Sequence, residues 1–458
     1  MKILMPIGFI RVLKMVGIFV LVTGGFLPVQ IWGENSQNTV LEQANGAFNK
    51  GDFKKVVELV EPLLKDASPS PQMYRLHILA LARMGNAPGA MDSYEKLVQS
   101  TKREDESLLR QLALAMILSK QADMREQMRG AVYTAFKEID SDEMIAYLED
   151  GLTDGSGMIR ALVVEALGQR KAGQRSKRLR EALKDSAGLV RATAVKSIGK
   201  SDDKNEIPLI EKSLQDEQAL VQIAAAGVLY ELGQRQRWTR LEKGAQSEEG
   251  YERGGAIRAF GELQDRRALP ILEKTARDTQ PSIRAAAIGS LGKIHDSESL
   301  PTLNAALFDP VPGVRNKAAF SMGYYESHQV FTPLTRALLD KDSGVQAAAS
   351  ASLLRVGAPF SVVEGTLHKL LQDQNPALRS IAVKALGNGN GVKVVGTLKL
   401  MLNDPIPGPR IVAVRALGRL GGHDLLPVLT RTLRDSDDAV RITAAAAIVK
   451  ILDAKIGI

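Results

Sequence analysis

Apolar residues recur three and four positions apart along most of the chain, in segments separated by short stretches rich in Asp, Pro and Gly. The segments LPTLNAALF (300–308) and LPVLTRTLR (426–434) show this spacing, which is typical of helices that bury one face. Alanine and leucine are abundant, whereas aromatic residues make up only 5% of the chain. This balance favours helices over β-sandwiches and barrels, so the pattern predicts an all-α protein.

In the C-terminal two-thirds of the chain, the breaks between helical segments recur with a fixed period of about 31 residues. Aspartate marks nine of ten breaks and Ser247 marks the other, and the interval between Asp340 and Asp373 is slightly longer than the rest. Six positions after the break stands arginine in eight units and glutamine, Gln222 or Gln346, in two. Nine positions after it stands alanine in nine units, and fourteen positions after it stands glycine in seven. Ten matched units define an internal repeat.

Each unit reads as two helices joined by a turn. The aspartate, often followed by Pro or Gly, ends the first helix and can accept backbone N–H bonds at the start of the second. The small residues nine, twelve and fourteen positions after it fit a surface where two helices meet closely. One such hairpin cannot bury its apolar face alone, so successive units must stack. The sequence therefore predicts an α-solenoid superhelix of about ten such hairpins over residues 141–453.

The segment DPVPGVRNKAAFSMG (309–323) combines an aspartate and an arginine that could form half of an ion-pair active site. A catalytic pair is needed once, whereas an Asp–Arg pair at this spacing occurs in seven units. We therefore interpret Asp309 and Arg315 as one rung of a structural ladder. The residues particular to this unit are Asn316, Lys317 and Phe320.

These units resemble the HEAT-repeat family, in the short form also found in phycobilisome lyase subunits. The resemblance implies that aspartate and arginine form a hydrogen-bonded ladder along the stack. Gln222 and Gln346 depart from this pattern, and their units end later, at ELG and RVG, which predicts a change of curvature or pairing there. The residues expected in the ladder are Asp185, Arg191, Asp278, Arg284, Asp309, Arg315, Asp373, Arg379, Asp404, Arg410, Asp435 and Arg441.

The first third of the chain repeats with a different, slightly longer period. GAFNKGDFKKVVELVEPLLKD (46–66) aligns with LALARMGNAPGAMDSYEKLVQS (79–100), so that Gly51 matches Gly85 and Leu63 matches Leu97. Each unit is a helix, a glycine turn and a second helix, and it resembles the tetratricopeptide family. A third unit near 107–137 lacks the turn glycine. The resemblance implies two to three tetratricopeptide-like hairpins over residues 38–138, with a groove for a peptide or helix.

Residues 1–33 have the features of a secretory signal. Three basic residues precede an uncharged run from Met15 to Trp32, and the polar segment GENSQNT follows. The run is close to the roughly 20 residues that a membrane span needs. A signal peptide cleaved after Gly33 and a membrane anchor through residues 15–32 therefore both stay open. Either form predicts an exported protein, periplasmic or anchored with the solenoid outside the cytoplasm.

Residue types that carry enzyme chemistry are sparse. The chain has no cysteine, and its five histidines lack the i, i+4 spacing of a helical metal pair. The sequence also lacks the His–Glu dyads of a HEAT-type di-iron hydroxylase, a Walker loop and a G-x-S-x-G motif. We expect a non-catalytic protein without cofactor or metal. The family resemblance leaves open an enzyme or lyase-like subunit that acts on a bulky protein substrate.

One face of the second helix in each unit is a candidate binding surface. The eleventh and fifteenth positions after the break point away from the buried face and would line the concave side of the stack. Nine of the twenty side chains at these positions are basic and three are acidic, and Phe320 and Tyr324 add aromatic groups, which often anchor protein interfaces. The predicted partner-binding residues are Phe320, Tyr324, Lys384, Asn388, Arg415, Arg419 and Lys450.

A second basic cluster lies in QRKAGQRSKRLREALK (169–184), predicted as a loop after the first repeat. With a formal net charge of +8, the chain suits an acidic partner. No aromatic residues interleave with the cluster, and export would remove most nucleic acid from reach, so nucleic acid is the weaker alternative. The sequence thus predicts a scaffold or adaptor in the cell envelope that binds other proteins.

Overall fold

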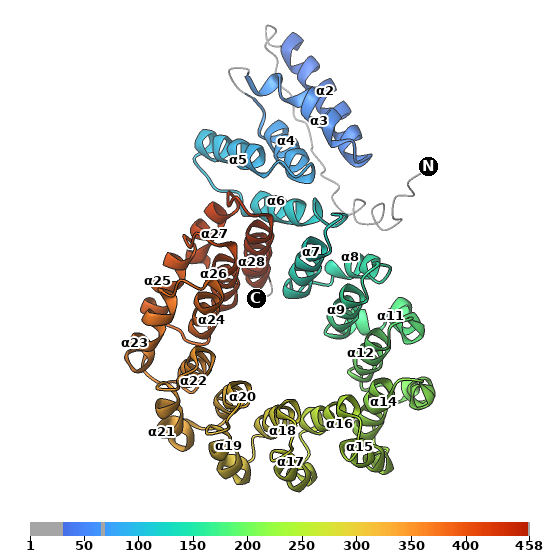
Figure 1. Cartoon of the computed structure of the whole chain (residues 1–458). Helices are drawn as coiled ribbons and strands as arrows, with labels where there is room; N and C mark the ends of the chain where they lie inside the picture. Colours follow the sequence, from blue (N-terminus) through green and yellow to red (C-terminus); the bar gives the residue numbers. More distant parts are fainter. Residues whose placement is uncertain (1–30, 66–68, 457–458) are drawn as a thin grey trace. The chain divides into compact units, whose positions relative to one another are not determined.

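The computed structural model describes residues 31–65 and 69–456, and every regular element among them is an α-helix or a short 3-10 helix. The all-α prediction is confirmed, with 27 α-helices in this part of the chain (Figure 1). The run Met15–Trp32 lies almost entirely outside the described residues, and α2 (Ile31–Asn49) begins just before the predicted cleavage point. Among the described residues, no helix has the length and apolarity needed to cross a membrane.

The chain divides into two compact units. Unit 1 comprises residues 1–150 and 422–458, and unit 2 comprises residues 151–421. The sequence predicted a boundary between residues 138 and 141 and a single array to residue 453. Packing instead groups the last hairpin with the N-terminal helices, because the two segments share one compact core.

Unit 2 is a succession of helical hairpins, and each second helix packs on the second helix of the next hairpin (Figure 1). The second helices start three residues after the repeat break, as the period predicts. They are α9 (Gly157–Gly168), α12 (Gly188–Gly199), α14 (Ala219–Glu231), α16 (Gly250–Leu263), α18 (Pro281–Ile294), α20 (Pro312–Met322), α22 (Ser343–Arg355), α24 (Pro376–Leu386) and α26 (Pro407–Leu420).

The first helices of these hairpins pack on their own second helices. They are α11 (Lys177–Glu181), α13 (Ile207–Lys212), α15 (Trp238–Ala245), α17 (Leu269–Thr275), α19 (Leu300–Ala306), α21 (Ser327–Ala337), α23 (Phe360–Leu371) and α25 (Val392–Met401), with α10 (Lys171–Gln174) ahead of α11. All but α23 are shorter than their own second helices.

The repeat aspartate sets the start of each second helix. One carboxylate oxygen of Asp309 accepts a hydrogen bond from the backbone N–H of Val311 at 2.9 Å, and Val311 is the residue just before α20. Pro312 follows as the first helical residue, where a missing N–H costs nothing and the fixed φ suits the helix. This local chemistry explains why the break recurs with aspartate and often proline.

The glycine fourteen positions after the break is required by the next repeat. A Cβ on Gly292 would lie 2.4 Å from the Cβ of Ser321, and a Cβ on Gly261 would lie 2.7 Å from the Cβ of Ser290. Each serine, twelve positions into its own repeat, donates from Oγ to a carbonyl oxygen of the preceding helix, as Ser290 does to Ile257 at 2.8 Å. We call this contact the glycine–serine seam.

Unit 1 is built from α3 (Phe53–Val60), α4 (Pro71–Arg83), α5 (Ala87–Thr101), α6 (Glu106–Leu118), α7 (Glu126–Glu138) and α8 (Met144–Gly151), with α2, α27 (Leu426–Thr432) and α28 (Asp438–Ile456). Gly51 and Gly85 have positive φ values of 76° and 80°, so both predicted turns need the conformational freedom of glycine. These helices fit the hairpin prediction, and the tetratricopeptide resemblance stays a prediction.

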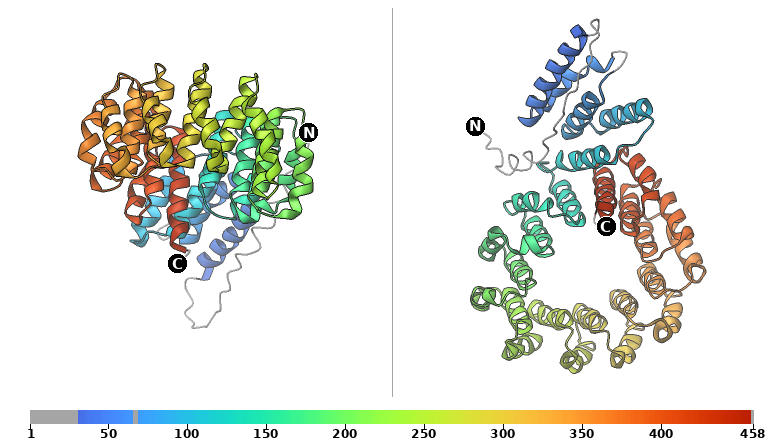
Figure 2. Two further views of the ribbon diagram at one scale, coloured as in Figure 1. Left: turned by 90° about the horizontal axis from the view of Figure 1, so that it is seen from below. Right: turned by 180° about the vertical axis from the view of Figure 1, so that it is seen from behind.

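The C-terminal helix α28 packs against α6 and α7, so segments from opposite ends of the sequence share one core. Figure 2 shows the red C-terminal helix beside the cyan helices of residues 106–138. Arg110 donates to Asp453 at 2.6 Å and to Glu143 at 2.7 Å, and Lys120 pairs with Asp438 at 3.1 Å. The helix is apolar on nearly all sides because it has neighbours on several faces.

Candidate functional site

The ladder residues form ion pairs between successive repeats. Arg284 donates from Nε and Nη2 to both carboxylate oxygens of Asp309, at 2.7 and 2.9 Å, and Arg315 reaches Asp340 in the same way. Within its own repeat, Arg315 donates only to backbone carbonyls, that of Asp309 at 2.9 Å among them. The interpretation of Asp309 and Arg315 as one rung was therefore wrong: each arginine of a rung spans to the aspartate of the following repeat.

Six such rungs occur among the described residues of unit 2: Arg160–Asp185, Arg191–Asp216, Arg253–Asp278, Arg284–Asp309, Arg315–Asp340 and Arg379–Asp404. Hydrogen bonds from Arg284 hold the pKa of Asp309 below its usual range, although burial opposes this. The paired arginines are mostly buried, as Arg315 is at 5% exposure. Each rung thus satisfies its own charges and offers none to a substrate.

Other predicted ladder residues make local contacts close to their own repeat breaks. The carboxylate of Asp373 accepts from the backbone N–H of Asn375 at 2.8 Å, and no ion pair to it occurs among the described residues. In α28, Arg441 pairs with Asp438 and donates to the carbonyl of Asp435, and Arg410 donates to the carbonyl of Asp404 at 2.8 Å. The two glutamines bond only to carbonyls of their own repeat and to one neighbouring side chain.

A small pocket of about 170 Å³ opens on the second helices of unit 2. It is lined by small residues, including Ala286 and Gly289 of α18, and by aromatic and basic side chains. We call it the aromatic–basic pocket, lined by Arg258, Lys293, Lys317, Phe320 and Tyr324. A Cβ on Gly289 would lie 3.2 Å from Cδ of Lys317, so the glycine leaves room for the lysine stem.

The two aromatic rings of this pocket form one cluster with a cation above them. The rings of Phe320 and Tyr324 meet edge to face with centroids 5.8 Å apart. The guanidinium carbon of Arg355 lies 4.6 Å from the Phe320 centroid and 5.1 Å from that of Tyr324. Tyr324 remains 48% exposed, so the cluster presents an aromatic edge to solvent beside a positive charge.

The positive charges around these rings are mostly uncompensated. Lys293 approaches Glu262 only at 4.0 Å, and no carboxylate pairs with Arg258, Lys317 or Arg355 in the part of the chain that the structure describes. Arg355 donates instead to the side-chain oxygen of Asn388 at 3.2 Å. The surface therefore carries a net positive field with an aromatic centre, which suits an anionic ligand.

The structure brings some of the predicted binding residues together. Phe320 and Tyr324 both line the aromatic–basic pocket, and Asn388 is linked to their rings through Arg355. Lys384 is exposed on α24, and Arg415 and Arg419 lie on the adjacent α26, with Arg419 reaching over Gly387. Lys450 belongs to α28, which is in unit 1.

The sequence prediction missed four residues of this surface: Arg258, Lys293, Lys317 and Arg355. Three of them occupy the eleventh and fifteenth positions after the break, which the repeat pattern already marks as pointing outward. These three could therefore have been predicted from the sequence. Lys317 stands at the eighth position after Asp309, outside that pattern. It lies three residues before Phe320 on the same helix, α20, and its Nζ is 5.9 Å from the Phe320 ring centroid.

The basic cluster at 169–184 is partly structural, because α10 and α11 form within it instead of the expected loop. Arg170 is 6% exposed and donates to the carbonyl of Ala166 at 2.7 Å. Arg180 is paired with Glu206. Two of its seven basic side chains thus already have partners within the protein, which weakens the case for this segment as a binding surface.

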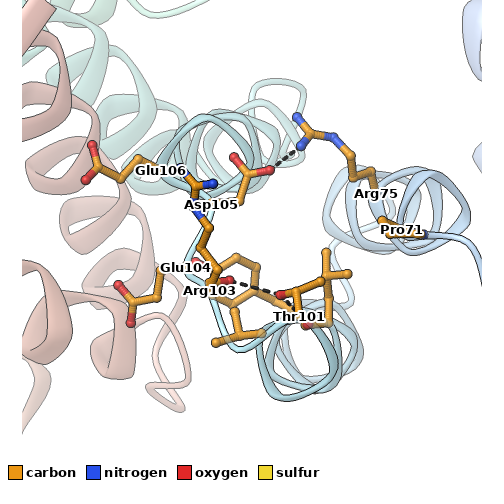
Figure 3. Close-up of a pocket in the computed structure, with 10 residues that line it drawn as sticks. Pro71, Arg75, Thr101, Arg103, Glu104, Asp105 and Glu106 are labelled. Carbon is orange, nitrogen blue, oxygen red and sulfur yellow. Dashed lines mark hydrogen bonds and ion pairs between the residues drawn. The ribbon is translucent and has the colours of Figure 1, made fainter.

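A second and larger pocket, of about 630 Å³, lies in unit 1 between α4, α5 and the start of α6. Figure 3 shows Arg75 turned toward Asp105, with Glu104, Glu106 and Arg103 around the opening. The apolar wall is formed by Pro71, Leu97 and Val98. Tyr94 also lines this cavity, and we call it the tyrosine pocket.

The histidines are held in separate local contacts. His77 is buried against Ser93, with Nδ1 and Oγ 3.0 Å apart, and burial lowers its pKa. His423 contacts Glu106 at 2.8 Å, and His328 contacts Glu326 at 3.4 Å. No group of three or more potential metal ligands converges among residues 31–65 and 69–456.

Comparison with known proteins identifies the repeats. The family profile described as HEAT repeats matches residues 176–253, 239–323 and 363–449, just over half of the chain. No curated protein matches the sequence.

Several solved structures are similar. The complex of CpcE and CpcF of phycocyanin lyase from Nostoc sp. PCC7120 is 21% identical, covering 52% of this chain and 93% of its own, with a TM-score of 0.35. Human deoxyhypusine hydroxylase is 21% identical, covering 54% of this chain and 96% of its own, with a TM-score of 0.26. The match to the family profile decides the assignment: the chain belongs to the HEAT-repeat family.

Proposed function

We propose that this protein is a non-catalytic scaffold or adaptor that binds an acidic protein segment on the second helices of unit 2. HEAT repeats generally mediate protein–protein interactions, which agrees with the family assignment. The observation that carries the proposal is the aromatic–basic pocket, where Phe320 and Tyr324 stand beside Arg258 and Lys317, which have no carboxylate partner among the described residues. Aromatic and arginine side chains are common anchors of protein interfaces.

The basic side chains would contribute differently from the aromatic ones. Lys293, Lys317 and Lys384 stand at the surface, where charge speeds association and selects acidic partners. Phe320 and Tyr324 would supply apolar contact area that is removed from water on binding. Charge reversal should therefore slow association and make binding sensitive to salt, whereas truncation of Tyr324 should speed dissociation.

Site-specific photo-crosslinking in the native cells tests this surface. A photoreactive residue replaces Tyr324, and a matched one replaces Leu400 of α25, which is 71% exposed on a first helix. We expect a discrete, stoichiometric protein adduct from position 324 and none from position 400. The double variant Lys293→Glu, Lys317→Glu should remove the adduct while the far-UV circular dichroism stays unchanged.

Charge reversal at Lys384, Arg415 and Arg419 extends the test along the same helices and should also weaken the adduct. An adduct that persists in both charge-reversed variants would contradict binding at this surface. A chain that turns over a small molecule or modifies the captured protein would favour the enzyme alternative.

We propose further that the scaffold works outside the cytoplasm. The support is the basic and apolar composition of residues 1–33. Mass spectrometry of the N-terminus of protein purified from fractionated cells is the test. A new N-terminus at Glu34, or an intact chain in the membrane fraction, agrees with export, and an intact Met1 in the soluble cytoplasm contradicts it.

A further inference from the structure

The tyrosine pocket of unit 1 contains a buried polar group without a partner. Tyr94 is only 4% exposed, and its hydroxyl has no hydrogen-bond partner among the described residues. A buried hydroxyl left in this state costs about 1–3 kcal/mol, and such groups in natural proteins call for an explanation. Because Tyr94 lines a cavity of about 630 Å³, a ligand in that cavity is the simplest partner.

The electrostatics of the pocket indicate the charge of this ligand. Glu104, Asp105 and Glu106 stand together where α5 gives way to α6, and all three line the cavity. Burial and the nearby carboxylates of Glu104 and Asp105 raise the pKa of Tyr94 well above its usual range. The phenol therefore keeps its proton, and its oxygen lies in a negative field where it can accept a hydrogen bond from a cation.

Most of the other charges of the pocket are already used. Asp105 pairs with Arg75, and its Oδ1 accepts from the backbone N–H of Leu108 at 2.9 Å. Glu106 contacts Nε2 of His423 at 2.8 Å. The side chain of Glu104 has no ion pair or hydrogen bond among the described residues. Of the basic side chains that line the pocket, Arg103 is the one without an ion pair among the described residues. The acceptors left for a ligand are thus Glu104 and the oxygen of Tyr94.

The shape of the pocket favours a side chain on a peptide over a free ion. Pro71, Leu97 and Val98 form an apolar wall beside the two acceptors, and the alkyl stem of a lysine or arginine would cover such a wall while its charged end reaches the oxygens. The cavity is larger than one such side chain needs, which leaves space for neighbouring residues of an extended segment.

We propose that the tyrosine pocket binds a lysine or arginine side chain of a basic protein segment, with Glu104 and the Tyr94 hydroxyl oxygen accepting its hydrogen bonds. This site is independent of the acidic partner proposed for unit 2, since it has the opposite charge and lies in the other compact unit.

Fluorescence anisotropy with the full chain and a labelled, end-capped peptide of alternating glycine and lysine tests the proposal. We expect saturable binding that Tyr94→Phe and Glu104→Gln each weaken about tenfold, the loss expected for one hydrogen bond to a charged group. Glu42→Gln, which changes an exposed carboxylate of α2 outside the pocket, should leave the affinity unchanged, and so should Lys293→Glu, Lys317→Glu in unit 2.

A stability measurement on the same variants removes the remaining ambiguity. Tyr94→Phe should keep or raise the melting temperature, because it deletes a hydroxyl that has no partner. A clear loss of stability would show that the hydroxyl is already satisfied within the protein and would overturn the proposal. Tighter binding of a matched glycine–glutamate peptide, unchanged affinity in Tyr94→Phe, or binding of spermidine without binding of the lysine peptide would each overturn it as well.

Discussion

We call the contact between two successive hairpins of unit 2 a joint. At six joints an arginine forms an ion pair with the aspartate of the next repeat, whereas the joints after Gln222 and Gln346 have no such ion pair among the described residues. After Gln222, the next repeat offers Ser247 in place of aspartate. After Gln346, the next aspartate is Asp373, which comes two positions later than at the other joints because that interval is longer. Arginine is thus missing at the two joints where no carboxylate stands at the right spacing.

Glutamine keeps one function of the arginine and gives up the other. Gln222 and Gln346 donate from Nε2 to the carbonyl oxygens of Asp216 and Asp340, at 2.7 and 2.6 Å, as the arginines do with Nη1. Neither carries a charge that would need a carboxylate, and an arginine buried there without one would be costly. The hydrogen bond to the carbonyl oxygen therefore acts within one hairpin and occurs with either residue, whereas the arginine charge occurs only where the next repeat offers a carboxylate.

The same two repeats also replace the glycine of the glycine–serine seam. Tyr230 and Leu354 stand at that position. The helices end one residue later, and Gly233 and Gly357 follow with φ values of 106° and 84°. The ring of Tyr230 packs 5.4 Å from that of Trp238, and its hydroxyl bonds to Asp265. At this joint, aromatic packing takes the place of close helix contact.

The largest difference between the two kinds of joint should come from removing their side chains. Arg315→Ala leaves Asp340 buried without its partner and is expected to cost on the order of 3 kcal/mol of unfolding free energy. Gln346→Ala removes a neutral hydrogen bond, and should cost about 1 kcal/mol. Urea unfolding followed by circular dichroism measures both, and equal losses would contradict the distinction.

Alanine substitutions at two glycines, one in the glycine–serine seam and one outside it, should change folding stability by smaller amounts and with opposite signs. Gly292→Ala forces a Cβ to within 2.4 Å of Ser321, and such overpacking typically costs about 1–3 kcal/mol. Gly227 of α14 has no atom within 4 Å of an added Cβ among the described residues, so Gly227→Ala should stabilise by about 0.5–1 kcal/mol. Melting temperatures of the two variants test this, and a shift of the same sign in both would refute it.

The smallest expected effect is the titration of a single rung. Because Arg284 holds the pKa of Asp309 below its usual range in the folded chain, this rung stabilises above the unfolded pKa of about 3.9 and loses its contribution as pH falls through the folded value. Asp309→Asn should therefore reduce the loss of urea stability between about pH 7 and pH 3. Glu249→Gln, an exposed change outside the ladder, is the control and should keep the full pH dependence.

Local features of the binding surfaces were accessible to sequence reasoning, and their assembly was not. Phe320 and Tyr324 stand out because their positions are usually polar or small, and both line a pocket in the structure. Lys317 lines that pocket together with residues of α18 only because α20 packs on α18, and Arg355 reaches the two rings from the next second helix, α22. The buried hydroxyl of Tyr94 gave no signal in the sequence, because whether a hydroxyl has a partner depends on what surrounds it in the folded chain.

By itself, the sequence determined the helical hairpins, their starts and the repeat columns, because helix periodicity, turn chemistry and the need to bury one apolar face act over a few dozen residues. It did not determine which aspartate each arginine would reach, since the distance depends on how two repeats stack. Nor did it show that α28 packs on α6 and α7. Only the tertiary structure decided these contacts, because they join residues that no local period relates.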